Sequence, residues 1–297
     1  DLAGAAKWLT TDCRETLERA SARETAARVA AGSLTRSLLK AFGIEVFGFV
    51  RQVGESRATI DLLDNQSQSP GLSPGLLEAL TKARDASDLY CPDEAASAQM
   101  REFINSAKVA KDTAGGIVEC HVFGCPVGLG SSMTIDGRLD GRIMGAVGAI
   151  QAFKGVEIGM GFGVATLPGS KVHDEIFFDE AQRDYPSLGY VRTTNNAGGL
   201  EGGMTNGMPV VVRGAMKPIS TLGKPLRSID LNTKEPSEAG WERSDVSAIS
   251  AASVIMENVI AFEIARAMIE KFGGDSLTEM KQNYANYLEA ARRLPIA

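Results

Sequence analysis

Apolar residues recur at helical spacing along several long stretches of the chain. They do so over residues 21–41, 94–114, 142–153 and 246–272, and a last amphipathic stretch begins at Ser276. Residues three or four positions apart share one face of a helix, so this period predicts helices. In the first helix we expect the following apolar face to be buried: Ala26, Val29, Ala30, Leu34 and Leu38.

Four other stretches are short, rich in branched and aromatic residues, and typical of strands. They cover residues 44–53, 115–130, 154–159 and 208–216, and the second of them runs into a glycine–proline turn. Strands and helices are mixed along the chain, without an internal repeat or an obvious linker. The pattern therefore predicts one domain over residues 1–297, of the α/β or α+β class.

Glycines mark the turns between these elements. Gly273 and Gly274 are expected to end the long helix before them, and Ser276 with Glu279 predicts a capping box at the start of the next. Residues 195–207 hold five glycines in thirteen positions. Their order does not fit the dinucleotide-binding fingerprint. Two interpretations stay open for this region: backbone shaped around a flat or closely approaching group, or two tight turns.

Composition excludes some classes of function. Hydrophobic residues make up 44% of the chain and charged residues 23%, as in ordinary globular proteins. The formal net charge of −6 argues against general nucleic-acid binding, which needs a basic face. An anionic ligand would therefore need local clusters of arginine and lysine. We see no signal peptide and no apolar run long enough for a membrane, so we expect a cytoplasmic protein without a membrane partner.

The cysteines and histidines suggest neither a metal site nor a hydrolase. No C-x-x-C pair occurs among the four cysteines. Adjacent Cys120 and His121 should face opposite sides of a strand, so we expect no metal there. The chain has only two histidines, His121 and His173, and no convincing Ser/His/Asp arrangement. His173 lies in a polar stretch and is expected to be exposed.

Three stretches are suited to anions. In the first, Ser21 and Glu24 have the spacing of a capping box, and Arg19 and Arg23 add positive charge around a helix start. Such an opening stabilises an anion. The two arginines are equally interpretable as solvated surface residues.

The other two stretches are Lys217 to Thr221 and Arg243-Ser244-Asp245. A lysine and two hydroxyls where a strand ends suit a phosphate, although a turn built around Pro218 needs no ligand. The triplet before the last long helix is also consistent with an ordinary N-cap and ion pair. From the residues alone, the chain is a globular protein with several anion-competent loops and no assigned reaction.

The same stretches resemble the chorismate synthase family. One family signature matches E-R-A-S-A-R-E-T-A-A-R-V-A-A-G-S-L at its constrained positions: Glu18, Ser21, Ala22, Arg23, Thr25, Val29, Gly32, Ser33 and Leu34. A second matches R-S-D-V-S-A-I-S-A-A-S-V-I-M-E-N-V, with Arg243, Asp245 and Glu257. Between them, C-P-D, P-V-G-L-G, A-F-K-G-V-E-I-G, N-A-G-G-L-E-G-G and M-K-P-I-S-T-L follow in family order.

This resemblance implies a lyase of the shikimate pathway with the β-α-β-α sandwich fold, assembled as a homotetramer. It implies the 1,4-anti elimination of phosphate from 5-enolpyruvylshikimate 3-phosphate, which gives chorismate for aromatic amino acid biosynthesis. The cofactor implied is reduced FMN, used without net redox change, and NADP is an associated nucleotide. A substrate with one phosphate and two carboxylates requires arginines gathered in one pocket.

The resemblance also implies roles for individual residues. Flavin contacts are implied for Arg19, Ala20, Ser21, Gln151, Ala152 and Gly202. The phosphate or ribityl tail of FMN is implied to lie on Lys217, Pro218, Ile219, Ser220 and Thr221. Arg23 is implied at the anionic substrate, Arg243 at substrate or flavin, and Asp245 near flavin N5 as a proton-transfer group.

One departure from the family pattern limits this assignment. Family members carry an N-terminal segment with two histidines, in G-E-S-H-G and G-H-A-D-L-A-G motifs, and the sequence begins at D-L-A-G, after both. We expect an N-terminally truncated chain, with unpaired sheet edges and exposed apolar surface. His121 and His173 match neither motif. The alternative interpretation is therefore a non-catalytic flavin- or anion-binding fragment, or a subunit that works beside a full-length partner.

Overall fold

A five-stranded antiparallel sheet forms the centre of the chain. The computed structural model describes residues 2–60, 74–240 and 244–294. The strand order is β2-β1-β3-β9-β4. The strands are β1 Glu45–Val53, β2 Ser56–Arg57, β3 Gly116–Phe123, β4 Phe153–Ile158 and β9 Val210–Met216. All four predicted strands are confirmed; three of them are shorter than predicted, and β4 begins and ends one residue earlier than predicted.

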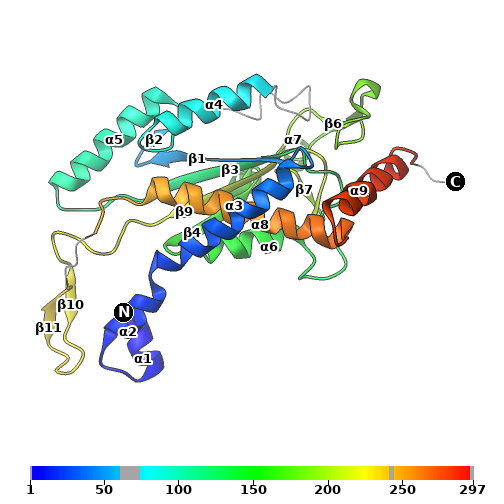
Figure 1. Cartoon of the computed structure of the whole chain (residues 1–297). Helices are drawn as coiled ribbons and strands as arrows, with labels where there is room; N and C mark the ends of the chain where they lie inside the picture. Colours follow the sequence, from blue (N-terminus) through cyan, green and yellow to red (C-terminus); the bar gives the residue numbers. More distant parts are fainter. Residues whose placement is uncertain (1, 61–73, 241–243, 295–297) are drawn as a thin grey trace.

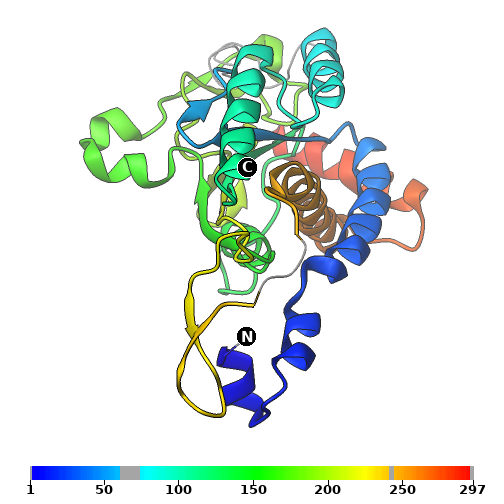
Figure 2. The ribbon, with the colours of Figure 1, turned by 90° about the vertical axis from the view of Figure 1, so that its left-hand side faces the viewer.

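Helices cover both faces of this sheet (Figures 1 and 2). Three of them lie on one face: α3 Thr25–Lys40, α6 Leu139–Gly148 and α8 Ile249–Phe272. On the other side, over β1 and β2, lie α4 Pro74–Ala86 and α5 Glu94–Val109, and α9 Leu277–Ala291 follows α8. Helices packed on an antiparallel sheet define an α+β fold. In the described part of the chain, no helix has the length and apolar character needed to cross a membrane.

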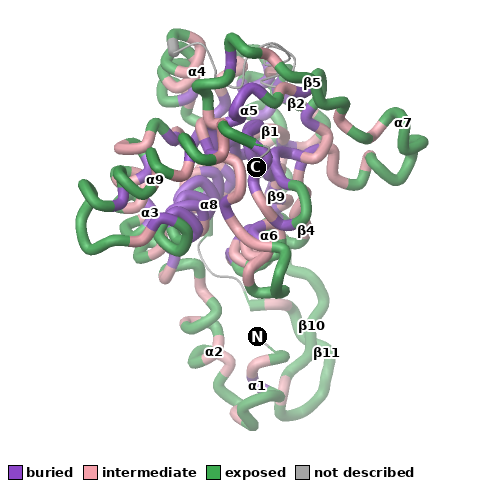
Figure 3. The backbone as a smooth tube through the Cα atoms, turned by 90° about the vertical axis from the view of Figure 1, so that its right-hand side faces the viewer, coloured by how far each residue is buried: buried purple, intermediate pink, exposed green. Residues whose placement is uncertain are grey.

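The two faces of the sheet differ in chemistry. Gly48 of β1 approaches Glu257 of α8, and Gly116 of β3 approaches Ile249, so even-numbered positions of these strands face α8. Odd-numbered positions, among them Glu119 and His121, face the opposite way because successive strand residues alternate. Cys120 and His121 therefore lie on opposite faces, as predicted. The buried residues gather in the sheet and in α8 (Figure 3).

The contact between α3 and α8 is built around a glycine. Gly32 is buried, and a Cβ at this position would lie 2.4 Å from the carbonyl oxygen of Asn258. Leu34, in contrast, is 75% exposed. Of the apolar face predicted over residues 26–38, Ala26, Ala30 and Leu34 are exposed, whereas Leu38 packs partly buried against the core. The helices approach along the line where the smallest side chain permits it. The buried residues of α3 are Thr25, Gly32 and Leu39.

Other predicted helix ends have the expected geometry. Gly273 ends α8 with a φ of 52°, a left-handed conformation that favours glycine. Ser276 Oγ accepts from the Glu279 amide at 3.2 Å, which confirms the N-terminal cap of α9. The Glu279 carboxylate accepts from the Asp275 amide at 2.9 Å, one residue before the position that a capping box uses.

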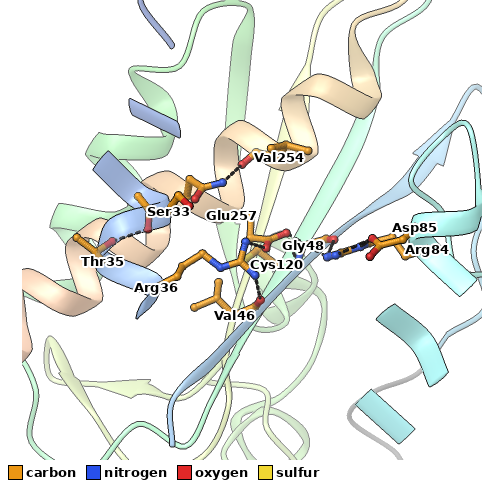
Figure 4. Close-up of polar contacts among 12 residues, drawn as sticks. Ser33, Thr35, Arg36, Val46, Gly48, Arg84, Asp85, Cys120, Val254 and Glu257 are labelled. Carbon is orange, nitrogen blue, oxygen red and sulfur yellow. Dashed lines mark hydrogen bonds and ion pairs between the residues drawn. The ribbon is translucent and has the colours of Figure 1, made fainter. Parts of the chain in front are cut away.

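A buried carboxylate holds four elements together (Figure 4). Glu257 Oε2, on α8, accepts from the amide of Gly48 in β1 and from Arg84 Nη1 on α4, both at 3.1 Å. Its other oxygen forms an ion pair with Arg36 of α3. Burial raises the pKa of Glu257, and the charges of Arg36 and Arg84 oppose that rise. The two arginines thereby compensate a carboxylate that is only 2% exposed.

The same cluster closes one edge of the sheet. Arg84 Nη1 donates to the Gly48 carbonyl at 3.0 Å, and Arg36 Nη2 donates to the Val46 carbonyl at 3.3 Å. The Val50 amide donates to the Tyr90 carbonyl at 2.9 Å. An open edge, expected from the sequence, is therefore not found at this part of β1, because side chains and a loop replace a neighbouring strand.

At the other side of the sheet, β4 pairs only with β9 among the strands of the described ranges. Large apolar side chains are also exposed on the helices below the sheet: besides Leu34, Phe262 of α8 is 44% exposed.

Two extensions leave the body at one end (Figures 1 and 2). One consists of α1 Leu2–Trp8 and α2 Cys13–Ala20, and the other is the hairpin of β10 Arg227–Ile229 and β11 Pro236–Glu238. A third projection carries α7 Gly169–Val172, β5 Ile176–Phe178 and β6 Tyr190–Arg192. The small hairpin of β7 Leu200–Glu201 and β8 Met204–Thr205 contains two of the five clustered glycines, Gly202 and Gly203. Both have positive φ, a conformation typical of glycine in tight turns. This observation favours the tight-turn interpretation for this part of residues 195–207.

Glu257→Gln should lower the free energy of unfolding by about 3 kcal/mol, because it removes the buried charge that Arg36 and Arg84 share while preserving side-chain shape. Among the described residues, Arg84 then keeps only its half-exposed neighbour Asp85 as an ion-pair partner. Urea denaturation at pH 7 measures the change. Glu270→Gln, on the exposed side of the same helix, is the control and should cost less than about 1 kcal/mol. Equal losses in the two variants would contradict a special role for Glu257.

Candidate functional site

The first predicted anion stretch lies at a junction between two helices. α2 ends at Ala20, Ser21 has extended backbone, and a short 3₁₀ turn, Ala22–Glu24, leads into α3. Ser21 makes no side-chain capping bond, so the predicted capping box is wrong. Glu24 binds forward instead, to Arg28 at 2.8 Å, because a charged partner one turn ahead competes with a backbone amide.

Glu24 connects this junction to the second predicted flavin segment. Gln151 Nε2 donates to Glu24 Oε1 at 2.8 Å. Gln151 and Arg28 hold the pKa of the Glu24 carboxyl below its usual range, against a small opposing effect of burial, and the charge of Arg19 contributes further. Residues separated by more than 120 positions are thus brought into direct contact.

The third predicted segment, Lys217 to Thr221, contacts Ala152, the residue that follows Gln151. The Lys217 amide donates to the Ala152 carbonyl at 2.9 Å, directly beyond the pairing of Phe153 with Met216. Ala152 has a φ of 68°, uncommon for a residue with a side chain, and this conformation turns the chain between α6 and β4. The structure therefore brings together residues 19–24, Gln151–Ala152 and Lys217, which the sequence analysis had selected separately.

Asp245 lies at the far end of the Lys217–Thr221 loop. Thr113 Oγ1 donates to the Ile219 carbonyl at 2.6 Å, and Ser244 Oγ donates to the Thr221 carbonyl at 3.3 Å. Asp245 and Thr221 line a cavity of about 190 Å³ together with Lys108 and Lys111. These two lysines were not selected from the sequence, since a lysine near a helix C-terminus is ordinary, and Asp112 lines the same cavity beside Asp245.

The charges at this junction leave cations available. Arg23 forms an ion pair with Glu18, on the exposed surface. Within the described ranges, no carboxylate pairs with Arg19 or with Lys217, and both side chains are exposed. One ammonium group with the nearby hydroxyls of Ser220 and Thr221 is a donor set that fits a phosphate.

Two predicted site residues are not joined to this cluster. Gly202, with a φ of 58°, is exposed in the β7–β8 turn, and neighbouring Gly203 bonds to Leu139 at the start of α6. Gln151 follows the other end of α6, so about 15 Å of helix separates the two places. Arg243 lies outside the described residues.

A second charged group was not selected from the sequence. Arg51, Glu119, Arg213 and Glu157 line a cavity of about 420 Å³, with His121 beside them. Each of the four strands β1, β3, β4 and β9 contributes one of these charged residues from a largely apolar stretch. A charged residue inside an apolar strand was the signal that could have identified them. His121 is fully buried and its Nε2 donates to Glu119 Oε1 at 2.8 Å, whereas His173 is exposed as expected.

The fold and the junction define an α+β protein with exposed cations and hydroxyl groups gathered where two helices meet a sheet. Comparison with known proteins identifies the family: the chorismate synthase family model matches residues 1–269. The chain belongs to the chorismate synthase family, whose enzymes are carbon–oxygen lyases of the shikimate pathway.

Relatives and a solved structure agree with this membership. A chorismate synthase of Geobacter sulfurreducens is 52% identical over 293 residues, which is 98% of this chain and 72% of that protein. One of Shouchella clausii is 52% identical over 277 residues, covering 93% of this chain and 67% of its own length. A crystal structure of chorismate synthase matches with a TM-score of 0.79 and 38% identity, over 97% of this chain and 76% of that one.

Glu119→Gln should destabilise the protein in a pH-dependent way. Burial acts to raise the pKa of Glu119, but the hydrogen bond from His121 and the charges of Arg51 and Arg213 outweigh it and lower the pKa. A lowered carboxyl pKa stabilises the fold above the unfolded value of about 4.5, and this contribution disappears as the pH falls through the folded value.

The variant should therefore lose about 3 kcal/mol at pH 7 and clearly less at pH 3.5, measured by urea denaturation at both pH values. Glu102→Gln, an exposed site, controls for the general effect of charge. A loss for Glu119→Gln that is identical at both pH values would contradict the lowered pKa.

Proposed function

We propose that this chain binds reduced FMN at the junction of residues 19–24, Gln151–Ala152 and Lys217–Thr221, and acts there on 5-enolpyruvylshikimate 3-phosphate. The reaction is the 1,4-anti elimination of phosphate that gives chorismate. The observation that carries the proposal is the pair of hydrogen bonds, Gln151 to Glu24 and Lys217 to Ala152, that unites the three segments. The assembled enzyme is a cytoplasmic homotetramer in this proposal.

The donor set supports FMN as the cofactor. Lys217 supplies a charge that no described carboxylate neutralises, and Ser220 and Thr221 supply hydroxyls, which together suit the phosphate of the cofactor. Ala152 and Gln151 present backbone and amide groups to the flavin, beside Arg19, Ala20 and Ser21. When bound, reduced FMN supplies electron density to the substrate without net redox change.

The remaining residues act on the substrate. The C–O bond to phosphate breaks and phosphate leaves with the electron pair, while a proton leaves C6 and a second double bond forms in the ring. Asp245 lines a cavity with Thr221, the last residue of the Lys217–Thr221 loop, and as a carboxylate it is suited to accept or relay that proton. Arg23 can exchange its exposed Glu18 partner for an anionic substrate group, because a surface ion pair is weak. Arg243 is assigned to substrate or flavin by its place in the family motif.

The decisive experiment is an anaerobic titration of photoreduced FMN, with and without 5-enolpyruvylshikimate 3-phosphate. Flavin absorbance and phosphate release are followed in the same sample. We expect saturable flavin binding and stoichiometric release of phosphate. Binding without release would contradict catalysis by this chain alone, and the absence of binding would contradict the proposed flavin site.

Lys217→Gln should weaken flavin binding by about tenfold, since one charge-assisted hydrogen bond contributes about 1.5–3 kcal/mol. Lys224→Gln, an exposed lysine in the following loop, is the matched control and should leave the affinity unchanged. Both variants are compared in the same titration. Equal affinities for the two variants would remove Lys217 from the site.

A further inference from the structure

A cavity of about 420 Å³ has a row of alternating charges as its floor. Arg213 of β9 pairs across the sheet with Glu119 of β3 on one side and with Glu157 of β4 on the other. Arg51 of β1 lies at the end of the row, with its Nε 3.6 Å from Glu119 Oε2. All four side chains occupy the face of the sheet opposite α8.

The arginines of this row keep unused hydrogen-bond donors. Arg51 Nε is buried and has no partner among the described residues, although Arg51 Nη1 donates to the Ile60 carbonyl. Arg213 Nη1 is 3.7 Å from Glu119 Oε2, longer than a charge-assisted hydrogen bond. Buried donors are normally satisfied, so Arg51 Nε lacks an acceptor here, whereas Arg213 Nε and Nη2 already donate to Glu157 and to the Gly159 carbonyl.

A third arginine increases the positive charge of the cavity. Arg57 of β2 lines the cavity, is exposed, and forms no ion pair within the described ranges. Three arginines face two carboxylates, Glu119 and Glu157, so these five side chains carry one formal positive charge. In a chain of net charge −6, such a local excess of arginine favours an anion.

The carboxylates limit which anion fits. Glu119 and Glu157 accept hydrogen bonds only, and a simple anion placed beside them would be repelled. A ligand that also carries hydroxyl groups can donate to them while its acidic group accepts from the arginines. The volume of about 420 Å³ accommodates a small organic molecule.

We propose that this cavity is a binding site for a small hydroxylated anion, whose phosphate or carboxylate is held by Arg51, Arg57 and Arg213 and whose hydroxyls donate to Glu119 and Glu157. The site is separate from the proposed flavin site. Arg213 precedes Lys217 by four positions, about 13 Å along an extended strand. It also uses none of the residues assigned to the reaction.

The two histidines provide a direct readout. His121 lines the cavity and His173 is exposed on another projection, so a ¹H–¹⁵N spectrum of the imidazole groups contains one reporter and one internal control. The probe is 3-phosphoglycerate, added at pH 7.5 to the Lys217→Gln protein, in which the flavin-site cation is removed. We expect a saturable shift of the His121 signals with unchanged His173 signals.

Matched variants complete the test. Arg57→Gln should weaken binding of 3-phosphoglycerate about tenfold, and because Arg57 is exposed and unpaired within the described ranges, the protein should fold normally. Arg213→Gln should abolish the shift, and Arg101→Gln, a surface arginine on α5, should leave it unchanged. Inorganic phosphate should bind at least about tenfold more weakly than 3-phosphoglycerate, since it cannot place a carbon-bound hydroxyl on the carboxylates.

Three results would overturn the proposal. The first is the absence of a saturable His121 shift at up to about 10 mM 3-phosphoglycerate, because a dissociation constant above that concentration means that binding is negligible. The second is an affinity that Arg57→Gln and Arg101→Gln leave equally unchanged. The third is equal affinity for inorganic phosphate and 3-phosphoglycerate, which would remove the recognition of hydroxyl groups.

Discussion

The carboxylate of Glu257 is the interaction on which the arrangement of the layers depends. It lies on α8 and contacts α3, α4 and β1 at once, through Arg36, Arg84 and the Gly48 amide. A buried carboxylate is costly unless charges and donors surround it, so these partners must occupy fixed positions. The cluster thereby sets the helix layer against the sheet and covers the edge of β1 with the same few groups.

That constraint extends to the proposed flavin site through α3. The helix is held to α8 along Gly32 and by Arg36, and its N-terminal end brings Glu24 to Gln151. Gln151 and Ala152 lie between α6 and β4, where Ala152 bonds to Lys217 at the end of β9. The site is therefore assembled from the ends of elements that the core holds rigidly, which is the usual way to place functional groups precisely.

The sheet separates two kinds of polar chemistry. The junction at Lys217 has exposed cations and hydroxyls at the periphery of the fold. The row from Arg51 to Glu157 is enclosed, and its opposite charges lie on adjacent strands of one face. In the first place, cations are left available at the surface. In the second, each carboxylate lies beside an arginine and the exposed Arg57 adds positive charge, so the proposed ligand carries both an acidic group and hydrogen-bond donors.

Period, turn residues and motif order are local properties, and they predicted the family, the α+β class, the four long strands and some of the helix limits. The helix predicted over residues 142–153 instead covers Leu139–Gly148. The sequence by itself also selected the segments at Arg19, Gln151 and Lys217 without establishing that they meet. Tertiary structure decided that contact, since the partners lie far apart along the chain. It also decided against the Ser21 cap and the Leu34 face, where Arg28 and Gln151 engage Glu24 and where α8 approaches Gly32. At Glu24 the partner that the sequence could not indicate is Gln151, which lies far along the chain, and at Gly32 the close approach of α8 leaves Leu34 outside the helix contact.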